Sequence, residues 1–549
     1  MADELIHSGT QLPALYNGTT TLVDAHLAAG RADKTAYIVL EDPARRITYR
    51  DLAGAVCRVG HGLRRLGIRM EDRVLLCLLD SPEFVFGFLG AMRIGAVPIP
   101  TNTQLRPAEY EYMLNDSRAR AAIVSSDLVD KIREIRGRLK WLEHVVVAPG
   151  PADRGELALD DLMAGQPDDL PPAETSRDDP AFWLYSSGST GFPKGCVHLH
   201  HDMVIAADCF GRRCLGLREV DLIFSVPKLF FAYGLGNSLY FPLRVGATTL
   251  LQPGRFDAAR TLEILHGRRP TVFIAVPTAF AAMLQVEDLG RAYDLSGIRV
   301  CHSGGEPLPL PIFERWKARF GVEILDGIGS SEVVHIYISN FPGRNRPGST
   351  GEAVPGYEFR VVDQDLRDLP AGEVGDLLVK GDSTAAGYWN KHEQTKRAFM
   401  GSWFFSGDRL SRDADGFYLF AGRSDDMFKV SGQWVAPAEV ESAVTSHPAV
   451  VESAAVARQD EDGLLKVAAY VVLRAGTTPG EPLAEEIRSW VQQRIAPFKA
   501  PRWIEFVADL PKTATGKIQR FKLRAEGMAG PGPHEKPREE RAGHVRGAG

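Results

Sequence analysis

Short apolar runs alternate with amphipathic stretches over most of the first two thirds of this chain, from Ala36 to about Ala353. Val74–Leu79 is typical of the apolar runs. The Ser81-Pro82-Glu83 sequence after it supplies an N-cap, a first-turn proline and an acid for a helix. Strands that alternate with helices in this way form α/β domains with largely parallel sheets. Such sheets bind ligands in the loops beyond the carboxyl ends of their strands.

The length of 549 residues is too great for one hydrophobic core, so we expect at least two domains. After Thr350 the predicted strands are shorter and richer in turns, which indicates a β subdomain, and a polar break at Gly422–Asp426 precedes a compact β/α unit. We therefore expect a large N-terminal domain (1–424) of mainly parallel α/β sheets plus a β subdomain. A small, mobile α+β domain (425–527) and a disordered tail (528–549) would follow.

Composition narrows the class of function. The net charge of −6 gives no general attraction to nucleic acid, and the basic stretch Lys131–Lys140 has the spacing of a solvated helix face. The first ten residues lack the apolar core of a signal peptide, and no run of about 18 apolar residues occurs. The six cysteines have neither CxxC nor metal-site spacing. We expect a cytoplasmic protein without nucleic-acid or membrane partners, and a homodimer is compatible with the sequence.

A polar loop, Tyr185–Gly195, follows the apolar run Ala181–Leu184. Its eleven residues include three Gly, three Ser, one Thr and one Lys. Glycine permits positive φ, so successive N–H groups can turn inward around anionic oxygens, and Lys194 adds a point charge suited to phosphate. The loop is not a Walker P-loop, because Gly195 rather than Ser or Thr follows the lysine. Its composition indicates a polyphosphate-binding loop or an ordinary flexible turn.

This loop and its partner motifs, six in order between about residues 30 and 525, resemble the adenylate-forming superfamily of acyl-CoA synthetases, luciferases and adenylation domains. The resemblance implies ATP and Mg²⁺ as cofactors and an acyl-AMP intermediate. It also assigns phosphate binding to the polar loop, through Ser187, Gly188, Ser189, Thr190 and Lys194.

The resemblance assigns further residues to the nucleotide. Glu332, at the end of DGIGSSE, is similar to the family's magnesium ligand, and a carboxylate there can hold Mg²⁺ against ATP phosphates. Asp408 resembles the acid that binds the ribose hydroxyls, and Arg423 the arginine that joins it. At the position of Ser331 the family commonly has Thr. The serine of this chain keeps the hydroxyl. The other nucleotide-binding residues that the resemblance implies are Gly304, Gly305, Glu306, Pro307, Asp326, Gly327, Ile328, Gly329, Ser331 and Phe420.

The C-terminal region carries the motif PKTATGKI, which ends with Lys517-Ile518. A cation between a carboxylate and the α-phosphate neutralises both anions and stabilises the charge that builds on phosphorus. The resemblance makes Lys517 catalytic together with Thr190 and Glu332, and makes Asp425 the hinge of the small domain. After the hinge turns, Lys429, Ser431 and Gly432 would bind CoA, and Gly432 would leave room for the pantetheine arm.

The segment Pro227–Gly236 (PKLFFAYGLG) contains no Asp or Glu, so it offers nothing to hold the ammonium of an amino acid. Its aromatic and small residues suit a flat apolar ring, which gains about 25 cal/mol per Å² on burial. The longer wording KLFFAYGLGNSLYFP, with His335-Ile336 downstream, resembles the benzoate–CoA ligase branch. This resemblance places around an aryl ring the residues Phe231, Ala232, Tyr233, Gly329, His335 and Ile336.

The resulting hypothesis is an ATP-dependent acid–thiol ligase that forms an aryl-CoA thioester, from benzoate or a close analogue, with release of AMP and pyrophosphate. Hydroxybenzoate, aminobenzoate and cyclohexane carboxylate remain alternative acids, because one or two pocket contacts decide a single polar substituent. A carrier protein remains an alternative acceptor to CoA. A non-enzymatic nucleotide sensor is disfavoured, because Glu332, Asp408, Arg423 and Lys517 are all retained.

Overall fold

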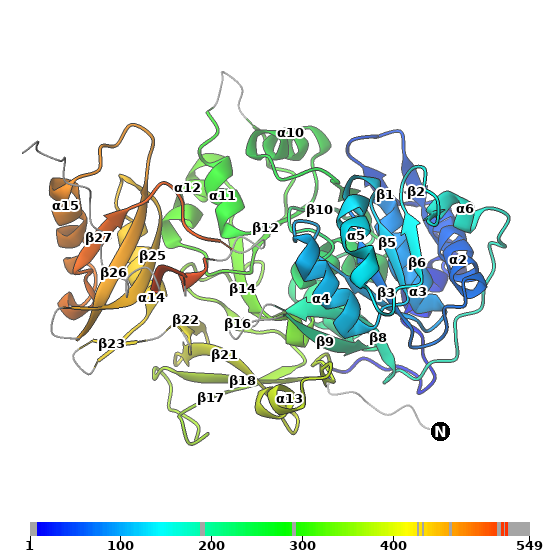
Figure 1. Ribbon diagram of the computed structural model, residues 1–549. Helices are drawn as coiled ribbons and strands as arrows, with labels where there is room; N and C mark the ends of the chain where they lie inside the picture. Colours follow the sequence, from blue (N-terminus) through cyan, green and yellow to red (C-terminus); the bar gives the residue numbers. More distant parts are fainter. Residues whose placement is uncertain are drawn as a thin grey trace, which may run out of the picture. The chain divides into compact units, whose positions relative to one another are not determined.

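The computed structural model separates into two compact units, Met1–Asp425 and Asp426–Gly549, each with its own hydrophobic core (Figure 1). Only the backbone is described for Lys429, Gln433 and Trp434. The residues that the structure describes are 8–186, 193–287, 293–424, 426, 428–430, 433–460, 464–512, 518–520 and 522–524.

A parallel sheet of five strands forms the first layer of the larger unit. Alternate residues of its strand β3 point to opposite faces, as strand geometry requires. Val74 and Leu76 pack with α2 (Tyr49–Arg65) and α3 (Pro82–Arg93). Leu75 and Cys77 pack on the other face with α4 (Pro107–Ser117) and α5 (Val129–Ile135) (Figure 1). The strand order is β4 (Val97–Pro100), β3 (Arg73–Cys77), β5 (Ala121–Val124), β6 (His144–Val147) and β7 (Leu157–Ala158).

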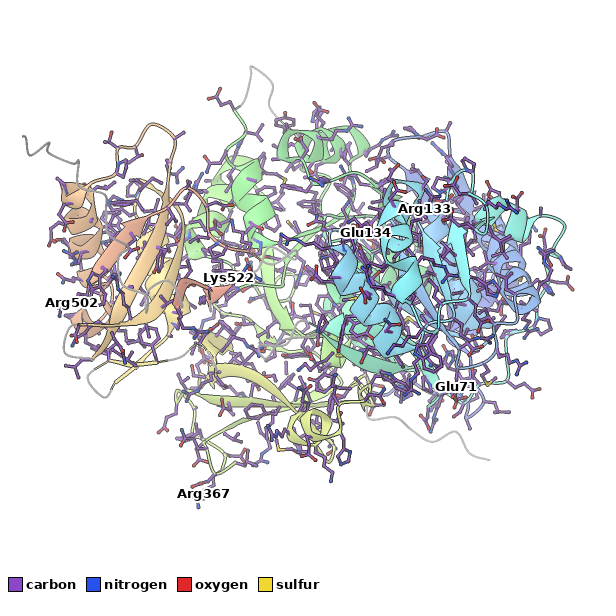
Figure 2. All side chains as sticks on the ribbon, viewed as in Figure 1. Glu71, Arg133, Glu134, Arg367, Arg502 and Lys522 are labelled. Atoms are coloured by element: carbon purple, nitrogen blue, oxygen red, sulfur yellow. The ribbon has the colours of Figure 1, made fainter. Side chains whose placement is uncertain are left out.

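Two helices of this layer, α3 and α5, coincide with stretches predicted as helical from the sequence. Helix α3 begins at Pro82 after an extended Ser81, but the Ser81 hydroxyl makes no capping hydrogen bond, so that part of the prediction was wrong. The first half of the basic stretch lies in α5, on which Figure 2 labels Arg133 and Glu134, and Arg136–Arg138 continues it as a 3-10 turn. The Arg133 guanidinium donates to both carboxylate oxygens of Glu156 at 2.8 Å. The positive charge of Arg133 is therefore paired with the Glu156 carboxylate of the same protein.

A second sheet, of nine strands, is parallel from β14 to β1 and antiparallel at both edges. Helices α10 (Ala258–Arg268), α11 (Pro277–Met283) and α12 (Leu310–Phe320) pack on one face, around the buried Trp316. Ser303 is the register partner of Asp326. The loop after β13 and the last residues of β14 therefore lie at the same edge of the sheet. The order is β16 (Glu352–Ala353), β15 (Ile336–Ser339), β14 (Ile324–Gly329), β13 (Val300–Ser303), β12 (Val272–Ala275), β10 (Leu222–Ser225), β11 (Thr248–Leu251), β1 (Thr35–Val39) and β2 (Arg46–Thr48).

Two antiparallel sheets complete the larger unit. In the smaller one, β9 (Lys194–Leu199) lies between β8 (Pro180–Ser186) and β19 (Gly387–Tyr388), so both sides of the polar loop join strands of one sheet. The β subdomain has five strands, with α13 (His392–Ala398) beside them (Figure 1). Its strands are β17 (Tyr357–Val362), β18 (Gly375–Gly381), β20 (Phe399–Met400), β21 (Trp403–Arg412) and β22 (Tyr418–Arg423).

In the part of the smaller unit that the structure describes, helices pack against a three-stranded sheet, and a two-stranded ribbon is also present. Val440, Val467 and Ile487 are fully or almost fully buried in its core. The predicted fold class is confirmed: mainly parallel α/β sheets plus a β subdomain, followed by a small α+β unit. The elements of the small unit are β23 (Phe428–Val430), β24 (Gln433–Val435), α14 (Pro437–Thr445), β25 (Val450–Gln459), β26 (Leu465–Leu473), α15 (Glu481–Gln492) and β27 (Trp503–Phe506).

Within the described part of the chain, no helix combines the length and the apolar character needed to cross a membrane. All six cysteines are buried and unpaired, and burial raises the pKa of Cys77, for example, to about 11. They therefore stay protonated thiols at neutral pH.

Candidate active site

Glu332 lies in a one-turn helix, Ser331–Val333, directly after β14. Its Oε1 accepts hydrogen bonds from the Tyr388 hydroxyl at 2.9 Å and the Ser186 hydroxyl at 3.3 Å. Its backbone carbonyl accepts from the Ala385 N–H at 2.8 Å. Among the residues that the structure describes, no N–H or O–H group donates to Oε2. The carboxylate is therefore held through one oxygen and open at the other.

A buried histidine also holds the turn that carries Glu332. His198 Nε2 lies 2.7 Å from the carbonyl oxygen of Ser331 and must donate, because a carbonyl only accepts. Its Nδ1 lies 2.7 Å from Asp202 Oδ2, and both side chains are fully buried. Burial by itself would raise the pKa of Asp202, but the imidazoles of His201 and His198 hold it below its usual range. Val334, at φ +70°, ends the turn in a conformation that β-branched residues rarely adopt.

Of the loop residues assigned to phosphate binding, Lys194 is the one that the structure describes. Its ammonium lies 4.3 Å from the centroid of the Tyr388 ring, a cation–π contact. Tyr388 therefore touches both Lys194 and Glu332, which are 138 positions apart in the chain (332 − 194).

The candidate ribose residues Asp408 and Arg423 are register partners on β21 and β22. Arg423 Nη1 donates to Asp408 Oδ1 at 3.0 Å, and the Tyr337 hydroxyl donates to Oδ2 at 3.5 Å. Phe420 pairs with Leu410 on the same two strands. The carboxylate of Asp408 is thus buried and oriented by a charge-assisted hydrogen bond, whereas the Arg423 side chain is 47% exposed.

The candidate adenine residues lie at the shared edge of β13 and β14. Gly304, Gly305, Glu306 and Pro307 follow β13, and β14 ends with Asp326, Gly327, Ile328 and Gly329. A Cβ on Gly304 would lie 3.0 Å from Tyr233 Cζ, so any other residue here would require the Tyr233 ring to shift by a few tenths of an ångström. The Leu308 N–H donates to Asp326 Oδ2 at 3.3 Å, and burial raises the pKa of the Asp326 carboxyl to about 8.

The candidate aryl-binding residues surround a chain of hydrogen bonds in which every proton can be placed. The Ser339 hydroxyl donates to the carbonyl of Asn340 at 2.8 Å, so its oxygen accepts from His302 Nε2 at 3.1 Å. His302 Nδ1 is then an acceptor, and the Tyr233 hydroxyl donates to it at 2.6 Å. The only donor of the Tyr233 side chain is therefore used within the protein.

His335 is held in the same region. Its Nε2 donates to the carbonyl of Tyr233 at 3.1 Å, and its ring lies 4.5 Å from that of Phe241. Burial lowers the pKa of His335 and of His302 to about 3 each, so both imidazoles are neutral at pH 7. Ile336 is buried beside Gly304, where a Cβ would meet its Cδ1 at 3.2 Å.

Two further predicted aryl residues, Phe231 and Ala232, lie at the start of α8 (Ala232–Leu235) and pack against the same core. They directly precede Tyr233 in the chain. This group of side chains is aromatic, aliphatic or neutral and contains no carboxylate.

Other predicted site residues lie outside the described residues, and for Lys429 the side chain does. They are Ser187, Gly188, Ser189 and Thr190 of the polar loop, Asp425, Ser431, Gly432 and Lys517. Sequence reasoning, in turn, missed Tyr388, His198 and His302. The histidines stand in the sequences HLHHD and HSGGE, but the contacts that link them to the candidate site, with Ser331 and Tyr233, span 133 and 69 residues, so no local pattern indicates those contacts.

The motif that ends with Glu332 implies a bound Mg²⁺. No group of three or more His, Cys, Asp or Glu suited to a metal occurs among the described residues. Mg²⁺ with nucleotides needs no such group, because one or two carboxylates and substrate phosphates commonly hold it. A single carboxylate with an open oxygen, as in Glu332, fits that role.

Comparison with known proteins gives the family. The family model "AMP-binding enzyme" matches residues 25–389, and the model "AMP-binding enzyme C-terminal domain" matches residues 439–517. The chain belongs to the AMP-binding enzyme family, which its motifs resemble.

Within this family the chain is similar to ligases of aromatic acids. It is 49% identical to benzoate–CoA ligase of Thauera aromatica over 94% of this chain and 98% of that protein. The crystal structure of the anthranilate CoA ligase AuaEII with anthranoyl-AMP matches with a TM-score of 0.90, at 44% identity over 94% of this chain and 98% of that one. A benzoate CoA ligase from Burkholderia xenovorans LB400 matches with a TM-score of 0.86, at 45% identity over 93% and 100%.

Proposed function

We propose that this chain is an ATP-dependent aryl-acid–CoA ligase, which joins benzoate or a close analogue to CoA through an acyl-AMP intermediate and releases AMP and pyrophosphate. One observation carries the choice of acid. His302 and His335 are buried and neutral, Tyr233 beside them is partly buried, and the Tyr233 donor is used by His302. Such a group receives an apolar ring and offers nothing to a charged substituent.

The residues of the larger unit would bind and orient ATP. Asp408, held by Arg423, is suited to accept from the ribose hydroxyls, and Lys194 is suited to a phosphate. Glu332 would hold Mg²⁺, which supplies charge neutralisation on the phosphates. No protein nucleophile is needed, since positioning and charge neutralisation are the main contributions to such a reaction.

The remaining roles are proposed from the motifs. Ser187, Gly188, Ser189 and Thr190 would bind the phosphates. Lys517 would neutralise the carboxylate and the α-phosphate as they combine. Asp425 would then act as the hinge, after which Lys429, Ser431 and Gly432 would line the path of the CoA thiol.

A panel of acids tests this function. We expect CoA-dependent AMP release with benzoate, with smaller rates for hydroxybenzoates, aminobenzoates and cyclohexane carboxylate, and none with amino acids or acetate. AMP release that needs no acid, or that is fastest with an aliphatic acid, would contradict the proposal. Replacing CoA by an acyl-carrier protein in the same assay distinguishes the carrier-loading alternative.

A further inference from the structure

Tyr388 contacts both charged side chains that we assign to the phosphates. Its hydroxyl donates to Glu332 Oε1 at 2.9 Å, and the face of its ring carries the Lys194 ammonium at 4.3 Å from the centroid. It is 8% exposed and belongs to β19, where it is the register partner of Cys196 on β9. Nothing in the spacing of the motifs points to this residue.

The two contacts have distinct chemical characters. The Glu332 carboxylate can only accept a hydrogen bond, so the Tyr388 hydroxyl donates to it and stays neutral. The ring face attracts a cation without neutralising it. One neutral side chain therefore orients an anion through its edge and a cation through its face.

The arrangement leaves both charges available to a ligand. Oε1 of Glu332 has two hydroxyl donors, from Tyr388 and Ser186, and within the described residues Oε2 has none. In the same part of the chain Lys194 forms no ion pair with Glu332. A direct ion pair between them would occupy the charges that a metal and a phosphate need.

We propose that Tyr388 is a positioning residue that holds Glu332 for Mg²⁺ and Lys194 for phosphate and keeps the two from pairing with each other. The inference rests on the proposed function, because it needs Mg²⁺ and ATP to bind at these side chains. It predicts that the hydroxyl and the ring of Tyr388 contribute to different parts of nucleotide binding. The hydroxyl contributes only when Mg²⁺ is present, and the ring contributes with or without it.

The experiment measures the equilibrium Kd of ATP by calorimetry, once with excess Mg²⁺ and once with EDTA. Tyr388→Phe removes the hydroxyl and keeps the ring. We expect its Kd for Mg·ATP to rise about tenfold, the usual weight of a hydrogen bond to a charged group, and its Kd in EDTA to stay within about twofold of the parent value. Tyr388→Leu removes both contacts, so it should weaken ATP binding several-fold in EDTA and by more than Tyr388→Phe does with Mg²⁺.

A matched control is Tyr49→Phe. Tyr49 is 1% exposed and donates to the Ala247 carbonyl at 2.8 Å, so this variant loses a buried tyrosine hydrogen bond elsewhere in the same unit. We expect it to bind ATP as the parent does in both conditions. All variants are compared below the melting midpoint of the least stable one, so that each is folded.

The outcomes separate the two proposals. A parent protein that binds no ATP in either condition would overturn the proposed function itself. If the parent binds Mg·ATP and Tyr388→Phe binds it equally well, the positioning role is wrong while the function stands. An equal loss with and without Mg²⁺ in Tyr388→Phe would show a general structural role and would also overturn the inference.

Discussion

The proposed nucleotide-binding and acid-binding regions of the larger unit differ in their electrostatics. In the first, charged side chains are oriented by hydrogen bonds, as Glu332 is by Tyr388 and Asp408 by Arg423. In the second, burial keeps His302 and His335 neutral and the Tyr233 proton is used internally. Charge therefore serves the reaction that all acids share, and shape serves the choice among acids.

This contrast gives a general expectation. Changes in the nucleotide-binding region should slow the reaction of every acid by a similar factor. Changes in the acid-binding region should alter the KM of the acid and leave that of ATP unchanged. The following predictions test each half of the comparison.

The largest effect is expected from Lys517→Ala. Loss of a preorganised charge at the reacting phosphate should lower the rate of acyl-AMP formation by about 10²–10³-fold for every acid. Conversion of supplied benzoyl-AMP to the thioester should be unchanged. Lys512→Ala is the matched control, because the Lys512 ammonium already pairs with Glu452 at 2.7 Å and Asp509 at 3.1 Å. Equal losses of both half-reactions in Lys517→Ala would contradict the assignment.

Glu332→Gln should have the next largest effect, about 10²-fold on acyl-AMP formation, because the amide keeps the shape and removes the anion that holds Mg²⁺. Benzoate and hydroxybenzoate should lose rate by the same factor, and a higher Mg²⁺ concentration should recover part of it. Glu358→Gln, which changes an exposed partner of Lys380, serves as the control. A loss that differs strongly between acids would break the proposed separation of charge from shape.

Tyr233→Phe tests the acid-binding region. It leaves His302 Nδ1 buried without its donor, which should cost about 1–3 kcal/mol of the free energy of unfolding. The KM of benzoate should rise several-fold and that of ATP should not change. Tyr49→Phe should be destabilised to a similar degree with both KM values intact. Steady-state kinetics and urea unfolding measure both quantities, and a rise in the KM of ATP alone would contradict the prediction.

The smallest effect concerns pH. Because burial lowers the pKa of His335 to about 3, the folded protein leaves it neutral while the unfolded chain protonates it below about pH 6.5. Its contribution to stability is therefore complete above pH 6.5 and is lost as the pH falls toward 3. Relative to His335→Phe, the parent should lose about 2 kcal/mol between pH 7 and pH 5. A difference that stays constant from pH 8 to pH 5 in urea unfolding would show that His335 is not held neutral.

The fold was largely predictable because it depends on local patterns. The apolar run Val74–Leu79 predicted the strand β3. Ser81-Pro82 marked the start of α3, although the serine hydroxyl does not cap this helix. The motif residues Asp408 and Arg423 are 15 positions apart and meet across neighbouring strands, as a hairpin allows.

The contacts that organise the candidate site were not predictable in the same way. Tyr388 reaches Glu332 across 56 residues, and His198 reaches the carbonyl of Ser331 across 133. These contacts depend on how separate sheets pack, and a single tyrosine or histidine in a short strand carries no local sign of its partner. Residues proposed to bind a ligand were thus visible as motifs, and the residues that contact them were visible only in the structure.

The central claim is that benzoate reacts with ATP before CoA takes part. Exchange of radiolabelled pyrophosphate into ATP tests this most directly, with Mg²⁺ present and CoA absent. The proposed function predicts rapid exchange that requires benzoate and stops when CoA and pyrophosphatase draw the intermediate forward. Exchange without any acid, or no exchange until CoA is added, would contradict it.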